Sequence, residues 1–293
     1  MQQLLTGVAL AGLAAATYSD LRTREVPDWL NYGMIAAGVG LRVIWAAASF
    51  DIMILVEGLL GLLLFFLVAS LMYYGGQWGG GDAKMLMGLG CLMGFGIPKS
   101  WTLQEIPDLA VFWIILLFSG ALYGLGASMV LSVRNFRALR QRFLPLFAKN
   151  RIRLAALMLL ALASAGGSRL SQDPFLRIGL LSLSGVAAFT ALLWIYVKAV
   201  EEVCMVKDYP LARLTEGDWI AEDVVVGGKR ICGPKDLGIS REQIATLKEL
   251  AGQKKILTVK VKEGIPFLPP FLIAFMLTWV WPAKEFLFSY VLP

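Results

Sequence analysis

Eight long apolar segments constrain this chain more than any other feature. They cover residues 2–19, 30–48, 52–74, 84–97, 110–131, 153–168, 174–198 and 266–290. About 20 apolar residues suffice for a helix to cross a bilayer. Backbone polar groups in lipid must be paired, which restricts spanning structures to helices and closed barrels. The segments lack the alternating pattern of barrel strands. We therefore expect an all-α polytopic membrane protein with about eight transmembrane helices. Segment 84–97 is short enough to be re-entrant instead.

Lysine and arginine are distributed unevenly between these segments. Of the 27 basic residues, 22 lie in segments 20–29, 75–84, 132–153 and 198–264. Basic residues favour cytoplasmic loops, so we expect these four segments in the cytoplasm and both termini outside. The short segment 132–153 holds seven basic residues and no acidic one, which predicts a topology anchor on anionic lipid. The membrane explains the net charge of +6 better than a nucleic-acid partner does.

The apolar and polar segments together predict five parts of the chain. Residues 1–131 form a transmembrane core, 132–152 a basic cytoplasmic loop, 153–198 an additional transmembrane hairpin, 199–264 a cytoplasmic α/β insertion and 265–293 a C-terminal transmembrane helix. In the insertion, Ser240 to Gln243 resemble a capping box that begins a helix, which Gly252 could end. Three stretches have strand-like composition, namely Trp219–Val226, Arg230–Cys232 and Ile256–Val261. A brace or a substrate-docking surface is the expected role of this insertion.

The absence of histidine excludes several kinds of catalysis. The chain contains no His, which removes the Ser-His-Asp triad, the Cys-His pair and the HExxH zinc site. Its three cysteines, Cys91, Cys204 and Cys232, do not form a C-x-x-C pair. We expect no metal and no cofactor, so that any catalysis would depend on carboxylates, Lys, Tyr, Ser or Cys.

Two aspartates are the best candidates for catalysis. Asp20 lies where the first apolar segment ends, and Asp82 lies where the fourth begins. Both are therefore expected at the same depth, at the cytoplasmic boundary. Two neighbouring carboxylates share a proton, because both cannot ionise cheaply. The ionised member can activate water while the protonated member polarises a peptide carbonyl. This arrangement would hydrolyse a peptide bond without metal or histidine.

A run of glycines precedes Asp82. Gly75, Gly76, Gly79, Gly80 and Gly81 allow positive φ angles and the close approach of another backbone. A flexible turn would explain the glycines alone. An aspartate directly after them, at a helix N-terminus that favours a negative charge, indicates a functional segment.

The G-x-G-D pattern resembles the motif of the type IV prepilin peptidase family, which includes archaeal preflagellin and prepilin peptidases. Here it is formed by Gly79, Gly81 and Asp82, and Ala-Lys-Met-Leu follows. The segment Asp-Leu-Arg-Thr-Arg-Glu-Val-Pro-Asp from Asp20 resembles the second catalytic segment of that family. The resemblance is clearest over residues 15–95, and Lys262 to Phe267 are also similar. It implies an aspartyl peptidase of the cell membrane with Asp20 and Asp82 as its catalytic pair.

The same resemblance implies the substrate. Members of the family remove short basic leader peptides, on the cytoplasmic side, from pilin-like or archaellin-like precursors that carry an N-terminal apolar helix. Many bacterial members also have paired C-x-x-C motifs that are linked to N-methylation. Because this chain lacks such pairs, we expect a peptidase without methyltransferase activity. Its eight apparent spans exceed the six common in the family. The oligomeric state is not predicted.

Two other functions remain open at this point. A presenilin or signal-peptide-peptidase type protease also uses G-x-G-D, but pairs it with an intramembrane Tyr-Asp, whereas Asp20 follows Ser19. An ion-coupled transporter could use both aspartates as an ion site. Transporters usually show repeats and charges near the bilayer midplane, and we detect neither in this sequence.

Four further charged residues have simpler explanations or weaker roles. Glu25 and Asp28 lie beside Asp20 and could contact a basic leader, although acidic residues in a loop are often only solvated. Arg42 and Glu57 lie within apolar segments, where a charge is costly. Both are near the outer ends of their segments, so we expect them to extend to the interface.

Overall fold

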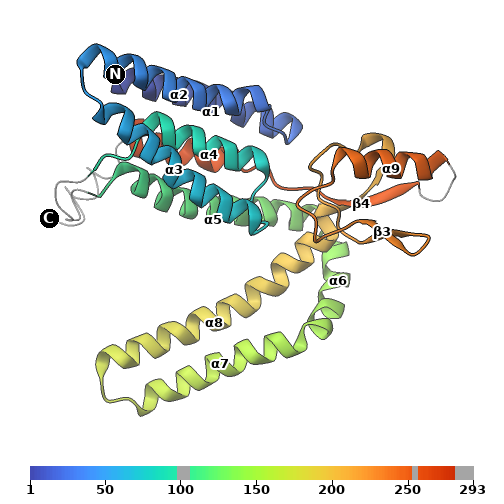
Figure 1. Ribbon diagram of the computed structural model, residues 1–293. Coiled ribbons are helices and arrows are strands. Elements are labelled where there is room, and N and C mark those ends of the chain that lie inside the picture. The colour runs from blue at the N-terminus through green and yellow to red at the C-terminus, as the bar shows by residue number, and fades with distance from the viewer. Residues whose placement is uncertain (98–105, 253–256, 281–293) are drawn as a thin grey trace. The chain divides into compact units, whose positions relative to one another are not determined.

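The computed structural model describes residues 1–97, 106–252 and 257–280 (Figure 1). The chain divides into two compact units. The first contains residues 1–125 and 264–293, and the second contains residues 126–263. The five-part division expected from the sequence remains a prediction.

Among the residues that the structure describes, six helices are long and apolar enough to cross a membrane, which confirms an all-α polytopic membrane protein. They are α1 (Gln2–Thr23), α2 (Asp28–Ser49), α3 (Met53–Tyr74), α5 (Asp108–Arg134), α7 (Arg151–Leu170) and α8 (Pro174–Val200), the last continuing as a π-helix to Met205. Two apolar helices are shorter, namely α4 (Gly80–Met93) and α10 (Leu268–Phe275), which continues as a π-helix over Met276–Val280. The count of eight spans remains a prediction, and the predicted part 281–290 of the last span lies outside the described residues.

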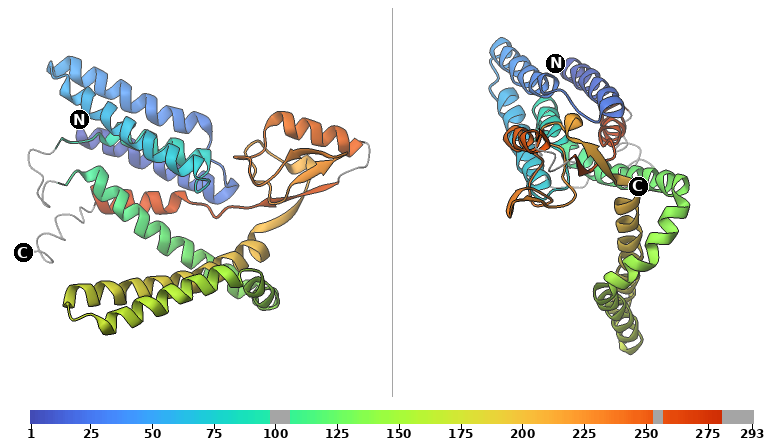
Figure 2. Two further views of the ribbon diagram at one scale, coloured as in Figure 1. Left: turned by 60° about the horizontal axis from the view of Figure 1, so that its bottom comes forward. Right: turned by 90° about the vertical axis from the view of Figure 1, so that its right-hand side faces the viewer.

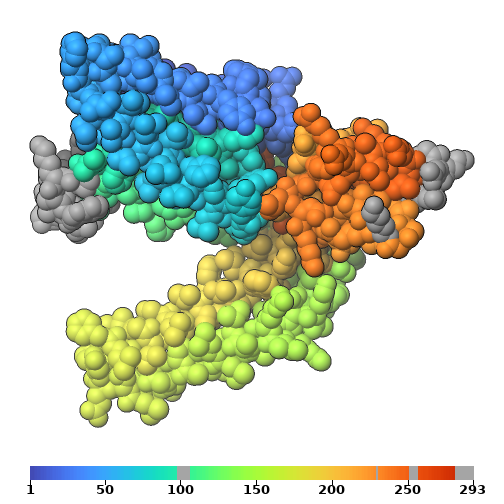
Figure 3. All heavy atoms as spheres, in the orientation of Figure 1, coloured from blue at the N-terminus to red at the C-terminus, as the bar shows by residue number. Residues whose placement is uncertain are grey.

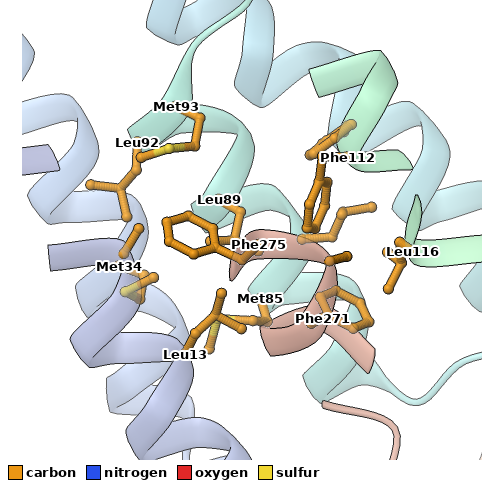
Figure 4. Packing of buried hydrophobic residues seen from close by; sticks show 14 of the residues in the cluster. Leu13, Met34, Met85, Leu89, Leu92, Met93, Phe112, Leu116, Phe271 and Phe275 are labelled. Carbon is orange, nitrogen blue, oxygen red and sulfur yellow. The ribbon is translucent and has the colours of Figure 1, made fainter. Parts of the chain in front are cut away.

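The short helix α4 is the centre of the first unit. It contacts α1, α2 and α3, and nine of its 14 residues are buried. Figure 4 shows Met85 and Leu89 of α4 among Leu13 of α1, Met34 of α2 and Phe275 of α10. Two further views show the helices of this unit from other sides (Figure 2). Because protein surrounds α4, its ends can lie at membrane depth without exposing backbone to lipid.

Arg42 completes the hydrogen bonds at the end of α4. Its Nε donates to the carbonyl of Cys91 at 2.9 Å, and one Nη donates to that of Leu92 at 3.0 Å. The other Nη donates to the carbonyl of Ile54 at 2.7 Å. The last carbonyls of a helix have no partner within it, and a cation there is favoured by the helix dipole. The expectation that Arg42 extends to the interface is wrong, because only 1% of the residue is exposed.

Two glycines let α3 and α4 approach closely. A Cβ atom on Gly61 would overlap the carbonyl group of Gly90, and one on Gly90 would overlap the carbonyl group of Gly61. Small residues of this kind let helix backbones meet in membranes, where packing takes the place of the hydrophobic effect.

The second unit contains an antiparallel helix pair formed by α7 and α8. Ser184 of α8 donates a hydrogen bond to the carbonyl of Ala161 in α7 at 2.8 Å. Figure 3 shows the heavy atoms of this helix pair in yellow-green and yellow. The segment 132–152 is not simply a loop, because residues Phe136–Lys149 form helix α6. The excess of basic residues in this segment predicts its side of the membrane and not its secondary structure.

The rest of the second unit is a small α/β module, as expected. Strand β1 (Val206–Pro210) pairs antiparallel with β4 (Thr258–Lys262), and β2 (Val224–Val226) with β3 (Lys229–Cys232). β1 was not predicted, and Ile256, the first residue of a predicted strand, lies outside the described residues. The capping box at α9 (Arg241–Gly252) is confirmed, since Ser240 and Gln243 exchange backbone-to-side-chain hydrogen bonds of 2.9 and 3.2 Å.

Replacing Arg42 should destabilise the first unit. In Arg42→Met, two buried carbonyls and one partly buried carbonyl would lose a charged donor, which should cost on the order of 3 kcal/mol. For a chain of this size we expect the midpoint of thermal unfolding in detergent to fall by roughly 5 to 10 °C. Arg22→Met is the matched control, since Arg22 lies on the exposed surface of α1. An equal change in both variants would contradict this role of Arg42.

Candidate active site

Asp20 is held by the beginning of α10. It lies in the last turn of α1, is 6% exposed and accepts a hydrogen bond from the backbone N–H of Leu268 at 2.9 Å. Thr17, one turn earlier, donates to the carbonyl of the same residue at 3.4 Å. Leu268 is the first residue of α10, and Pro269 and Pro270 follow it without N–H groups. The carboxylate thus accepts the first free N–H of a helix, a position that favours negative charge.

Asp82 lies in the first turn of α4 and is half-buried. It interacts with the backbone of Gly79 and with the negative charge of Asp20. The structure therefore places the two predicted aspartates close enough for their charges to interact, although they come from different helices. Each of the two carboxylates lies at the N-terminus of a helix.

Aromatic side chains fix the segments on which the two carboxylates depend. Trp78 immediately precedes the Gly79–Gly81 segment, and Phe267 immediately precedes Leu268. Their ring centroids are 5.8 Å apart. Trp78 also packs against Trp113 of α5 at 5.8 Å and Phe271 of α10 at 5.3 Å. This cluster ties the start of α4 to the start of α10, and thereby limits how far Asp20 and Asp82 can separate.

The glycines act through close approach rather than through positive φ. Among the predicted glycines, only Gly76 has a positive φ, of 65°. Gly79 has a φ of −72°, and Gly80 and Gly81 already belong to α4. A Cβ atom on Gly81 would lie 3.2 Å from Cβ of Val26 in the α1–α2 turn, whereas one on Gly80 would meet nothing nearer than 3.8 Å. The helix therefore begins earlier than the sequence suggested, and tight packing restricts Gly81.

Glu25 and Asp28 have different surroundings. Asp28 begins α2 and forms an ion pair with Lys84 of α4. Its side chain is 68% exposed, but part of its charge is already balanced. Glu25 lies in the α1–α2 turn, where its carbonyl accepts a hydrogen bond from Ser19 at 2.8 Å. These contacts do not bring Glu25 or Asp28 to Asp20 or Asp82.

Three groups on α2, α5 and α10 were not predicted as part of the site. Tyr123 of α5 is close enough to Asp20 for their charges to interact. The N–H of Leu268 is a backbone donor, so no side-chain pattern could have revealed it. Asn31 of α2 is fully buried, and its amide has no hydrogen-bond partner within the described ranges. A polar residue at a buried helical position was the only signal for Asn31.

The chemistry that this arrangement allows is proton transfer between carboxylates. Across residues 1–97, 106–252 and 257–280, no three His, Cys, Asp or Glu residues are grouped so that they could hold a metal ion. The two acidic groups interact at one end of a helical bundle, with an oriented N–H donor on one of them. Such a pair can take a proton from water and deliver one to a peptide group.

Comparison with known proteins supports the resemblance seen in the sequence. Residues 7–125 match the type IV leader peptidase family. A preflagellin peptidase of Methanococcus maripaludis (strain C6) is 29% identical over 132 residues, which are 44% of this chain and 57% of that protein. Preflagellin peptidases of Methanococcus voltae and Methanocaldococcus jannaschii are each 26% identical over 132 residues, again 44% of this chain and 56% of each relative.

The chain thus spans little more than half the length of the curated relatives that it matches. No solved structure matches it significantly. The matched region carries both Asp20 and Asp82, whereas Leu268, the hydrogen-bond partner of Asp20, lies outside it. Residues 7–125 of this chain match the type IV leader peptidase family, as the two aspartate segments predict.

Proposed function

We propose that this chain is a membrane aspartyl peptidase that removes basic leader peptides from prepilin-like or preflagellin-like precursors. The observation that carries the proposal is that Asp20 and Asp82 lie close enough for their charges to interact, within the segment that matches the type IV leader peptidase family. The names of the three relatives support a preflagellin-like substrate.

In the proposed reaction, the two carboxylates share one proton and hold one water. Leu268 N–H binds Oδ2 of Asp20, which leaves Oδ1 to accept a proton from water. The N–H also favours the ionised form of that carboxylate. The water oxygen bonds to the peptide carbonyl carbon while protonated Asp82 donates to the carbonyl oxygen. When the tetrahedral intermediate collapses, the C–N bond breaks, Asp20 gives its newly gained proton to the leaving nitrogen, and a hydroxyl of the intermediate returns a proton to Asp82.

The substrate would enter from both the membrane and the cytoplasm. The apolar helix of a precursor can pack beside the apolar helices of the first unit, and its leader junction would then reach the boundary where α1 ends and α4 begins. The distribution of basic residues supports a cytoplasmic location for this boundary. Glu25 and Asp28, in the α1–α2 turn and at the start of α2, are the candidates for contact with a basic leader. We propose that the chain is a peptidase without methyltransferase activity, because it lacks paired C-x-x-C motifs.

Substitution of either aspartate should abolish cleavage. We expect Asp20→Asn and Asp82→Asn each to lower the rate of leader removal by about 10³-fold or more, because neither amide can replace the shared proton. The measurement is processing of preflagellin-like and prepilin-like precursors by membranes that contain equal amounts of each variant. Asp208→Asn in the exposed part of β1 is the control. Full processing of the precursors by either Asp20→Asn or Asp82→Asn would refute the assignment of these two residues as catalytic.

Two neighbouring glycines should respond differently to alanine. In Gly81→Ala the new methyl group would press on Val26, 3.2 Å away, and displace the start of α4. A displacement of this kind can cost about 10-fold or more in rate. In Gly80→Ala the nearest atom is at 3.8 Å, so we expect the rate to change by less than about threefold. Comparison of kcat for the two purified variants tests this packing. The same loss in both would show that flexibility, not close contact, is required.

A further inference from the structure

Helix α6 carries an exposed stripe of phenylalanines. Phe136, Phe143 and Phe147 are 62%, 40% and 53% exposed. Their spacing of seven and four residues places them on one face of a helix. Leu146 of the same helix is only 2% exposed, and α6 packs against α8. Much of the phenylalanine stripe therefore remains exposed after α6 has packed within the second unit.

Basic side chains flank this phenylalanine stripe. Arg137 and Arg140 are exposed and three positions apart, so they lie together on the helix surface. Neither has a carboxylate partner among the residues that the structure describes. Arg142 differs, because its Nε binds Glu202 at 2.8 Å. Since segment 132–153 contains no acidic residue, the two free guanidinium groups can only meet an anion from outside the segment.

The neighbours of α6 in the chain place it at a membrane surface. Helix α5 ends at Arg134 and α7 begins at Arg151, and both are long and apolar enough to cross a bilayer. A helix that connects two such spans without entering either must lie near the headgroups. An amphipathic helix with aromatic residues on one face and arginines beside them binds in that plane.

We propose that α6 is an interfacial helix that binds the phosphate headgroups of anionic lipids through Arg137 and Arg140, while the phenylalanine stripe enters the acyl region. Charge complementarity identifies the headgroup, since a basic surface near an anionic leaflet gains free energy from each Lys or Arg. The phenylalanine stripe identifies a lipid as the source of the phosphate group, since a soluble phosphate would give Phe136, Phe143 and Phe147 nothing to pack against. This surface belongs to the second unit, whereas Asp20 and Asp82 belong to the first, and the proposal does not depend on their role.

Lipid binding by the purified full chain tests the basic part of the surface. Native mass spectrometry from a neutral detergent would count bound phosphatidylglycerol and phosphatidylcholine. We expect preferential binding of phosphatidylglycerol, weakened about tenfold in the double variant Arg137→Gln, Arg140→Gln. The matched control is Lys235→Gln, Lys248→Gln, which removes the same charge from exposed sites of the α/β module. Equal phosphatidylglycerol binding in both double variants, or displacement of the lipid by millimolar inorganic phosphate, would overturn the proposal.

Photo-crosslinking in membranes tests the apolar part. A benzophenone amino acid at position 147 lies in the stripe, whereas one at position 138 lies on the opposite face of α6. We expect crosslinks to lipid acyl chains from position 147 and at least several-fold fewer from position 138. Both single replacements are at exposed positions, and unchanged thermal unfolding would establish that each variant is folded. Equal lipid crosslinking from the two positions would contradict an oriented interfacial helix.

Discussion

The first unit depends on how α4 ends inside a bundle of membrane helices. A helix of 14 residues is only about 21 Å long, so one of its ends must lie within the apolar layer. Lipid offers no hydrogen-bond donors to the terminal carbonyls of α4. The guanidinium of Arg42, from α2, donates hydrogen bonds to two of them. The guanidinium also binds the carbonyl of Ile54 at the start of α3. One buried cation therefore joins α2, α3 and α4, and it fixes the depth at which the other end of α4 presents Asp82.

The two carboxylates of the candidate site are supported in different ways. Asp20 is buried and is bound by a backbone donor at a second helix start. Asp82 is half-buried, and the Trp78 cluster holds the segment that precedes it. Asp20 is thus held in a fixed geometry by a hydrogen bond, whereas the side chain of Asp82 is only partly exposed. Unequal surroundings give paired carboxylates distinct roles in acid–base catalysis.

Sequence reasoning predicted the features that depend on composition over many residues. Apolar length predicted the membrane helices, whereas the common membrane depth of Asp20 and Asp82 remains a prediction. Sequence reasoning failed where one tertiary contact decides the outcome. Arg42 was expected at the interface because nothing in its own segment shows the carbonyls of α4. Helix α6 is not predicted from the charge of its segment, because only the helical spacing of its apolar residues indicates a helix. The partner of Asp20 is a backbone group nearly 250 positions away, which no local pattern encodes.

The hydrogen bond between Asp20 and Leu268 also has a consequence for biosynthesis. The helices that carry Asp20 and Asp82 leave the ribosome first, and the whole second unit, residues 126–263, follows before Leu268 is made. At about 5 to 20 residues per second, this interval lasts on the order of ten seconds. During that time both aspartates are present, but neither α10 nor its N–H donor exists. The hydrogen bond of Asp20 can therefore form only after the second unit has been synthesised, so Asp20 lacks this donor throughout that interval.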